Sequence, residues 1–196
     1  MATELALDTI LKVAGVGGVA AAIVNQVLKT VVDAVAGVWK RRADATYAAV
    51  RSVVMLERYV QRSEAHLTAS EIAADRRETL GSLPLSDPLP SDVNWRAFNT
   101  KLAFRVLSFP AEVEAAQARC DLSERETGFW GGDEDAIRLG LAAWDLAVTI
   151  RKRYRLGHNT ELAELIPLLN DRKMEKARRH GQWLAKRYDK EMLARL

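Results

Sequence analysis

The sequence contains few of the residues that interrupt helices or cross-link chains. Its 196 residues include 1 cysteine, 5 prolines and 11 glycines. A single cysteine, Cys120, excludes an internal disulfide framework and a zinc site built from several cysteines. The long stretches without proline are rich in alanine, which favours helix because alanine loses no side-chain entropy on entering one. We therefore predict an all-α protein, in which the 48% hydrophobic content supplies a core.

Motifs for catalysis or cofactor binding are equally scarce. The three histidines, His66, His158 and His180, are far apart, and none forms the E-x-x-H pair of di-iron bundles. The chain has no P-loop, G-x-S-x-G or H-E-x-x-H motif. A lone cysteine in a helix usually serves as a small apolar residue. These absences favour a non-enzymatic protein without metal or cofactor; the alternative is an enzyme whose carboxylates converge only in the fold.

Charge is distributed unevenly along the chain. Residues 61–150 contain 15 acidic and 9 basic side chains, whereas residues 151–196 contain 13 basic and 6 acidic ones. This asymmetry predicts an acidic body with a basic C-terminal arm. Such an arm can contact anionic lipid, nucleic acid or the acidic body itself.

The stretch "LKVAGVGGVAAAIVNQVL", residues 11–28, has three interpretations. Its G-x-G-x-x-A spacing resembles a dinucleotide-binding turn, but residues 40–80 are helical in pattern, whereas that fold needs alternating strands and helices. As a membrane span, the stretch is nearly uncharged and places Ala14, Gly18 and Ala22 on one close-packing face. As a soluble helix, it continues a polar stripe formed by Glu4, Asp8, Lys12, Gln26, Lys29, Asp33 and Lys40.

The segment after "KRR" at residues 40–42 has the periodicity of a half-buried helix. Its core face is formed by Ala49, Val53, Leu56, Val60, Ser63 and Leu67, and the arginines Arg51, Arg58 and Arg62 lie on another face. Thr68 and Glu71 have capping-box spacing, which predicts that a new helix begins near residue 69. The proline-containing segment 81–94 is then expected to be an ordered surface connection, because Leu83, Leu85 and Leu89 provide apolar contacts.

Three further helices are predicted. Asn99 or Thr100 begins a short one, and Ser108 before Pro110 is expected to begin another that ends near Ser123. "GFWGG" at residues 128–132 is a loop, and Phe129, Trp130 and Asp133 are candidate partner-binding residues. The next helix is apolar over a wide arc, so we expect it to be central in the bundle, with Gly157 as its stop.

The last segment is predicted to be interrupted at Pro167 and then to continue as a basic amphipathic helix. Its apolar stripe is Met174, Ala177, Gly181, Leu184 and Tyr188, which we expect to dock onto the bundle. Its basic residues are Arg172, Lys173, Lys176, Arg179, Lys186, Arg187 and Lys190. These residues could alternatively lie on anionic lipid.

A short N-terminal hydrophobic segment, the "KRR" junction, "TYAAVRSVVMLERYV" and "LPSDVNWRAFNTKLAFRVLSFPAEVEAAQ" follow one another in this chain. This order resembles a class of uncharacterised bacterial proteins that have an N-terminal membrane anchor and a helical cytoplasmic domain. The resemblance covers about residues 10–155 and implies an architecture without implying an activity. It also implies an inner-membrane location with the C-terminal body in the cytoplasm.

The predicted organisation is a hydrophobic N-terminal helix at residues 1–39, a helical bundle at 40–166 and a basic C-terminal helix at 167–196. The predicted function is a membrane-associated protein that acts through protein contacts or self-association. One alternative is a cytoplasmic module that contacts nucleic acid through its basic tail. Another is a protein that permeabilises membranes with its glycine-rich N-terminal helix. No small-molecule substrate is evident.

Overall fold

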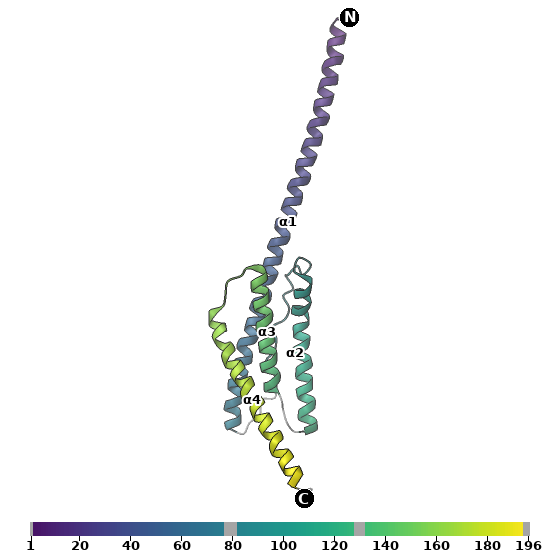
Figure 1. Cartoon of the computed structure of the whole chain (residues 1–196). Helices are drawn as coiled ribbons and strands as arrows, with labels where there is room; N and C mark the ends of the chain where they lie inside the picture. Colours follow the sequence, from purple (N-terminus) through teal and green to yellow (C-terminus); the bar gives the residue numbers. More distant parts are fainter. Residues whose placement is uncertain (1, 77–81, 128–131, 194–196) are drawn as a thin grey trace. The chain divides into compact units, whose positions relative to one another are not determined.

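The computed structural model describes residues 2–76, 82–127 and 132–193, and gives side chains for residues 26, 28–76, 82–126 and 132–178. This described part forms four helices (Figure 1): α1 (Ala2–Asp75), α2 (Thr100–Thr127), α3 (Gly132–Tyr154) and α4 (Thr160–Leu193). The predicted all-α class is confirmed. The chain divides into two compact units, Met1–Asp44 and Ala45–Leu196, and α1 contributes residues to both.

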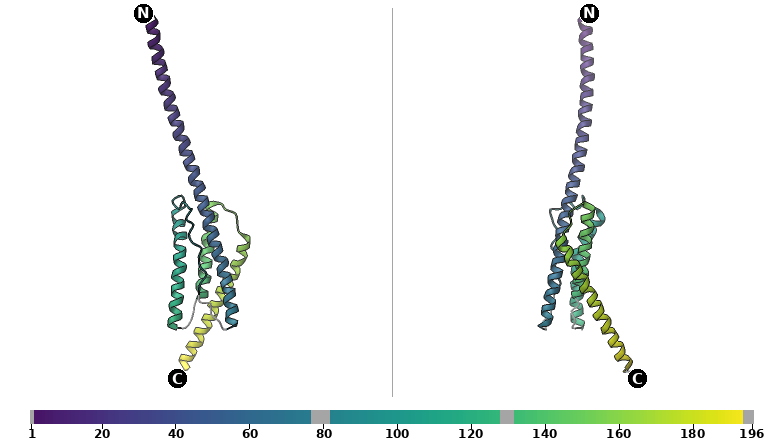
Figure 2. Two further views of the ribbon diagram at one scale, coloured as in Figure 1. Left: turned by 180° about the vertical axis from the view of Figure 1, so that it is seen from behind. Right: turned by 60° about the vertical axis from the view of Figure 1, so that its left-hand side comes forward.

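The second unit is a helical bundle formed by residues 45–75 of α1 together with α2, α3 and α4. Helix α3 contacts both α2 and α4 (Figure 2). It also approaches α1 at Gly140, where an added Cβ would lie 3.1 Å from Cβ of Ser63. Helix α3 therefore has the central place that its wide apolar arc predicted, and glycine at position 140 permits the close approach to α1.

The core face of α1 agrees with the periodicity of the sequence. All six residues predicted to form it are buried, namely Ala49, Val53, Leu56, Val60, Ser63 and Leu67. The three arginines on the other face are exposed, namely Arg51, Arg58 and Arg62. Tyr59 extends the buried face to α2, where its ring meets that of Phe109 edge-on at a centroid distance of 4.9 Å.

The capping box predicted at Thr68 is wrong. Helix α1 continues to Asp75, and the Thr68 hydroxyl donates to Oε1 of Glu64, one turn earlier, at 3.1 Å. Leu67 and Ala73 are both buried, so the core holds this part of the chain in the same helix. Tertiary packing has overridden a local capping signal.

Two prolines that we expected at helix boundaries lie inside helices. Pro110 is within α2 and Pro167 is within α4. Each proline removes one backbone hydrogen bond. Helix α2 has buried residues on both sides of its proline, Val106 and Val113, and α4 has Leu162 and Leu169. Packing of the turns before and after each proline against the core keeps the helix continuous across it.

The start of α2 agrees with one of the predicted caps. Oδ1 of Asn99 accepts a hydrogen bond from the backbone N–H of Leu102 at 3.2 Å, as an N-cap does. Ser108 does not begin a helix; its hydroxyl lies within hydrogen-bonding distance of the Arg105 carbonyl and of the Glu112 carboxylate.

The end of α3 differs from the prediction. Arg155, not Gly157, adopts the left-handed backbone conformation, with φ of 54°. The N–H of Leu156 then bonds the carbonyl of Arg151 at 3.0 Å, which closes the last turn. The carbonyl of Gly157 accepts a hydrogen bond from Nη1 of Arg151. We expected Gly157 to end the helix by its own conformational freedom. The chain turns at Arg155 instead, and the side chain of Arg151 holds the following residues through the carbonyl of Gly157.

The connection before α2 is ordered against the bundle, as expected. Leu83 is buried and Leu89 packs against the core, whereas Leu85 is exposed. Arg62 of α1 holds this segment by donating to the carbonyl of Leu85 at 2.9 Å and by pairing with Asp87 at 2.6 Å.

Candidate interaction surfaces

A buried ion pair joins α1 to the end of α3. Glu57 of α1 is only 7% exposed, and its carboxylate accepts hydrogen bonds from Nε and Nη2 of Arg151 at 2.7 and 3.0 Å. Nδ2 of Asn159 donates to the same carboxylate at 3.0 Å, while its Oδ1 accepts from the N–H of Leu162 and caps α4. The network is buried and holds the end of α3 and the start of α4 against α1, so we assign it a structural role. Sequence reasoning missed it, and the one signal was a glutamate beside the apolar face of α1.

The arrangement around Cys120 does not favour nucleophilic chemistry. The thiol is buried, and its Sγ lies 3.8 Å from Oδ2 of Asp135. Burial and the neighbouring carboxylate raise the pKa of the Cys120 thiol. A raised pKa keeps the group as the thiol, which is a much weaker nucleophile than the thiolate. Among the described residues, no group of three or more histidine, cysteine, aspartate and glutamate side chains is placed to hold a metal ion.

Asp133, a predicted partner-binding residue, lies at the contact between α3 and α4. Its Oδ2 is 2.5 Å from Nζ of Lys176, and its Oδ1 is 3.7 Å from Nε2 of His66. Burial alone would raise the pKa of Asp133, but the contact with His66, the hydrogen bond from Lys176 and the charge of Lys176 together lower it. Asp133 therefore serves an internal contact. The other two predicted partner-binding residues, Phe129 and Trp130, lie outside the described residues.

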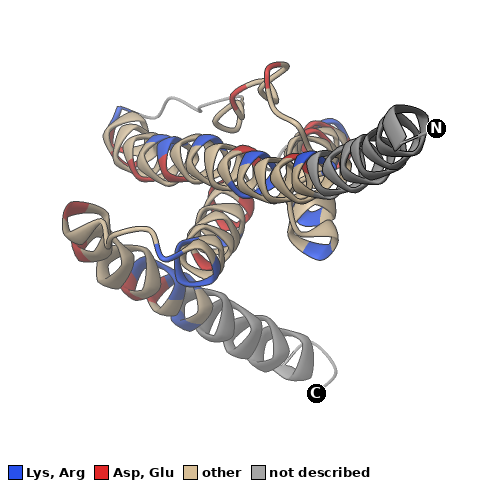
Figure 3. Cartoon of the chain, turned by 90° about the horizontal axis from the view of Figure 1, so that it is seen from above, with Lys and Arg blue, Asp and Glu red and all other residues tan. Residues whose placement is uncertain are grey.

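The basic arm makes a second contact with acidic side chains of the bundle. Nη2 of Arg172 lies 3.5 Å from Glu64 and 3.4 Å from Glu71, both on α1. Both helices carry charged residues of each sign (Figure 3). Lys173 is exposed. The side chains of the other predicted basic residues, Arg179, Lys186, Arg187 and Lys190, lie outside the described part.

The apolar stripe predicted for α4 is wrong where the structure describes it. Met174 is 70% exposed and Ala177 is also exposed. The stripe's remaining members, Gly181, Leu184 and Tyr188, lie outside the described side chains. Helix α4 instead contacts the core through Leu162, Leu165, Ile166 and Leu169. Arg172 and Lys176 follow Leu169 on the same face of α4, at helical spacing. The residues of α4 that face the bundle are therefore apolar up to Leu169 and basic after it, where they contact the acidic side chains of α1 and α3.

Apolar side chains are exposed on the part of α1 that precedes the bundle. Six of them form what we call the N-terminal apolar face: Leu28, Val31, Val32, Val35, Val38 and Trp39. Trp39 is 71% exposed and Val38 is 65% exposed. The polar residues Gln26, Lys29, Asp33 and Lys40 occupy other positions around the same helix. The soluble interpretation expected the apolar side to pack on the bundle, whereas its described residues are exposed.

The candidate membrane span lies largely outside the part of the chain whose side chains are described. This applies to Ala14, Gly18 and Ala22, the residues predicted to form its packing face. Within the described residues, the helices contain no stretch of sufficient length and hydropathy to traverse a bilayer.

A second exposed apolar surface lies on α2. What we call the α2 outer face consists of Phe104, Leu107, Ala111, Ala115, Ala118 and Leu122, spaced at three and four residues and all exposed. Phe104 is 73% exposed and Leu122 is 55% exposed. The opposite side of the same helix is buried in the core through residues such as Phe109 and Val113. The inner side of α2 packs in the core, whereas the α2 outer face is exposed in the described part of the chain.

Comparison with known proteins adds no relative: no family model, no curated protein and no solved structure matches the sequence.

Proposed function

We propose that the protein is a non-enzymatic, membrane-associated helical protein that acts through contacts with other proteins. The observation that carries this proposal is the N-terminal apolar face. Full burial of a valine or leucine side chain contributes about 1.5–3 kcal/mol, and this face exposes five such residues and a tryptophan. A lipid surface takes up an amphipathic helix through such a face and leaves the polar residues in water.

The residues at the end of the face support a lipid partner. Trp39 is followed directly by Lys40, Arg41 and Arg42. Tryptophan is enriched at the boundary between lipid and water because its ring is apolar and its indole N–H is polar. Each lysine or arginine near an anionic leaflet contributes about 1 kcal/mol of attraction. The positive-inside rule supports our proposal that the bundle is on the cytoplasmic side of a bacterial inner membrane.

The resemblance to bacterial proteins with an N-terminal anchor supports the same location. In this proposal, residues 11–28 extend the lipid contact toward the N-terminus. A nucleic-acid partner for the basic tail is less favoured, because Arg172 and Lys176 already contact carboxylates of the bundle. The bundle would then present its own surfaces to protein partners near the membrane.

Vesicle flotation of the full chain tests the lipid contact. We expect it to float with vesicles of phosphatidylethanolamine and phosphatidylglycerol. Val35→Glu introduces a charge into the N-terminal apolar face and should weaken binding about tenfold or more, since it costs more than the 1.4 kcal/mol of one tenfold step. Thr30→Glu adds the same charge at an exposed position away from the face. This control variant should float almost like the unmodified chain.

Failure of the unmodified chain to float would overturn the proposal. Equal flotation of both variants would show that the N-terminal apolar face is not the lipid contact. Fractionation of bacterial cells that express the full chain then distinguishes two modes of attachment. Resistance of the membrane fraction to carbonate and high salt indicates an integral anchor, and release by carbonate indicates a helix lying on the surface.

A further inference from the structure

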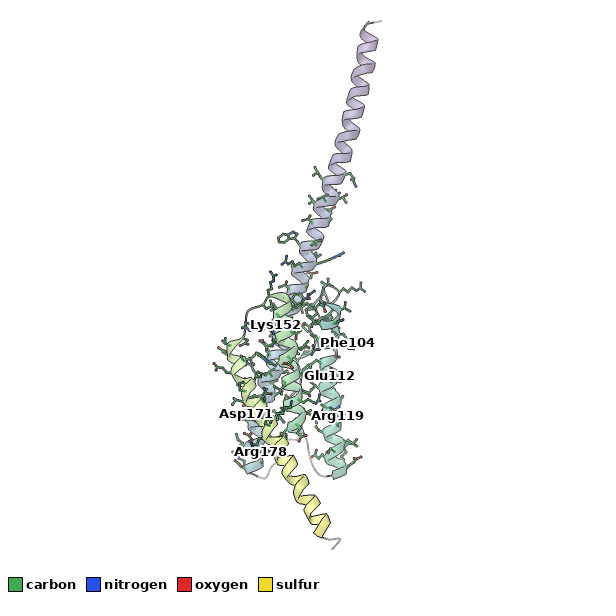
Figure 4. All side chains as sticks on the ribbon, in the orientation of Figure 1. Phe104, Glu112, Arg119, Lys152, Asp171 and Arg178 are labelled. Carbon is green, nitrogen blue, oxygen red and sulfur yellow. The ribbon has the colours of Figure 1, made fainter. Side chains whose placement is uncertain are left out.

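The α2 outer face requires an explanation that membrane attachment does not give. The face extends from Phe104 to Leu122, which corresponds to about 27 Å along the helix. Helix α2 lies at one edge of the bundle in Figure 1 and in the left view of Figure 2, and Phe104, Glu112 and Arg119 are labelled along it in Figure 4. An apolar stripe of this length between charged residues is typical of a protein interface.

The sizes of its side chains suggest what covers it. Phe104 and Leu107 are at one end and Leu122 is at the other, and the three alanines between them present a low, flat surface. Small residues let two helix backbones approach closely, because the interaxial distance depends on the side chains at the contact. An arrangement with large residues at both ends and small ones in the middle fits a second helix that runs in the opposite direction and has the same pattern.

We infer that the α2 outer face binds the same face of a second copy of this chain, with the two α2 helices antiparallel and related by a twofold axis near Ala115. A twofold interface uses the same patch on both partners, so the patch must complement itself. In this register, Leu107 lies opposite Leu122 of the partner subunit. Ala111 lies opposite Ala118 of the partner subunit, and the two copies of Ala115 meet at the axis.

The charges beside the face support the antiparallel register. In this register, Glu112 lies near Arg119 of the partner subunit, and Arg105 lies near Glu126 of the partner subunit. Each pair occurs twice across the axis and joins opposite charges. Arg119 contacts Asp135 at 3.3 Å, and the five N–H donors of a guanidinium allow it to bind a second carboxylate.

Cysteine cross-linking of the full chain tests the register directly. In a Cys120→Ser background, Ala115→Cys places one thiol on each side of the axis. A disulfide forms readily when the two Cα atoms are within about 7 Å, so mild oxidation should give a covalent dimer. Thr149→Cys is the matched control, because Thr149 is exposed on α3. It should form dimer much more slowly, and equal rates for the two variants would overturn the inference.

Sedimentation velocity tests the interface without cross-linking. One helix from each copy makes a small interface, so we expect a dimer that dissociates on dilution. Ala115→Arg should sediment as a monomer with unchanged circular dichroism, because residue 115 does not contact the core. Val35→Glu should keep the dimer while losing lipid binding. An unmodified chain that is monomeric at all concentrations, or a dimer that persists in Ala115→Arg, would overturn the inference.

Discussion

Glu57 and Arg151 are separated by 94 positions in the chain and form a two-point ion pair inside the bundle, with Nε to Oε1 at 2.7 Å and Nη2 to Oε2 at 3.0 Å. The charged atoms are largely removed from water, since the side chains of Glu57 and Arg151 are 9% and 18% exposed. Two parallel hydrogen bonds fix the orientation of both groups. The pair therefore determines how the end of α3 meets α1.

Removal of one member of this pair should destabilise the bundle strongly. Arg151→Met leaves the Glu57 carboxylate buried with only Asn159 as a partner, and we expect a loss of about 3–5 kcal/mol in the free energy of unfolding. The double variant Glu57→Leu and Arg151→Met should recover much of this loss, because no buried charge remains. Urea unfolding followed by circular dichroism measures both. A single variant as stable as the original chain would contradict the structural role assigned to the pair.

Gly140 should be intolerant of any side chain. A Cβ at this position would lie 3.1 Å from Cβ and 3.2 Å from Oγ of Ser63, so α1 and α3 must separate slightly. We expect Gly140→Ala to lower the free energy of unfolding by about 1–3 kcal/mol, as overpacking of a core does. This loss exceeds the helix propensity that alanine gains over glycine.

Gly37 provides the matched control for this substitution. It lies in α1, and an added Cβ there would have no atom within 4 Å. Gly37→Ala should therefore leave the unfolding of the bundle unchanged and add a little helix. Introduction of Ser63→Gly into Gly140→Ala should restore part of the lost stability. If Gly140→Ala and Gly37→Ala had the same effect, the contact between α1 and α3 would not be as close as described.

The parts of the fold that local pattern determines were predictable. The buried face from Ala49 to Leu67 follows helical periodicity, and Asn99 caps α2 through a bond that spans three residues. The errors arose where distant packing competes with a local signal. Pro110 and the capping box at Thr68 both indicate helix boundaries locally, and the core keeps both helices continuous.

The contacts of the charged residues were less predictable for a related reason. The basic character of α4 was evident, but the orientation of Arg172 and Lys176 depends on how α4 is rotated against the bundle. That rotation is determined by Leu162 and Leu169, which the predicted stripe did not include. The partner of Glu57 lies on another helix, and no local spacing relates the two.

The contact of Asp133 with Lys176 should make docking of α4 sensitive to acid. The folded protein holds the pKa of Asp133 below its ordinary value of 3.8, because burial is outweighed by the contact with His66 and the hydrogen bond and charge of Lys176. A depressed pKa contributes stability that is present above the unfolded value, so this contribution should decline as the pH falls below about 4. Tryptophan fluorescence and unfolding between pH 6 and pH 2.5 measure the loss. Asp133→Asn should be less stable at pH 6 and should lose less stability on acidification than the unmodified chain.

Asp145→Asn, at an exposed position of α3, is the control and should retain the original pH dependence. Identical pH profiles for Asp133→Asn and the unmodified chain would show that Asp133 does not couple proton binding to the docking of α4.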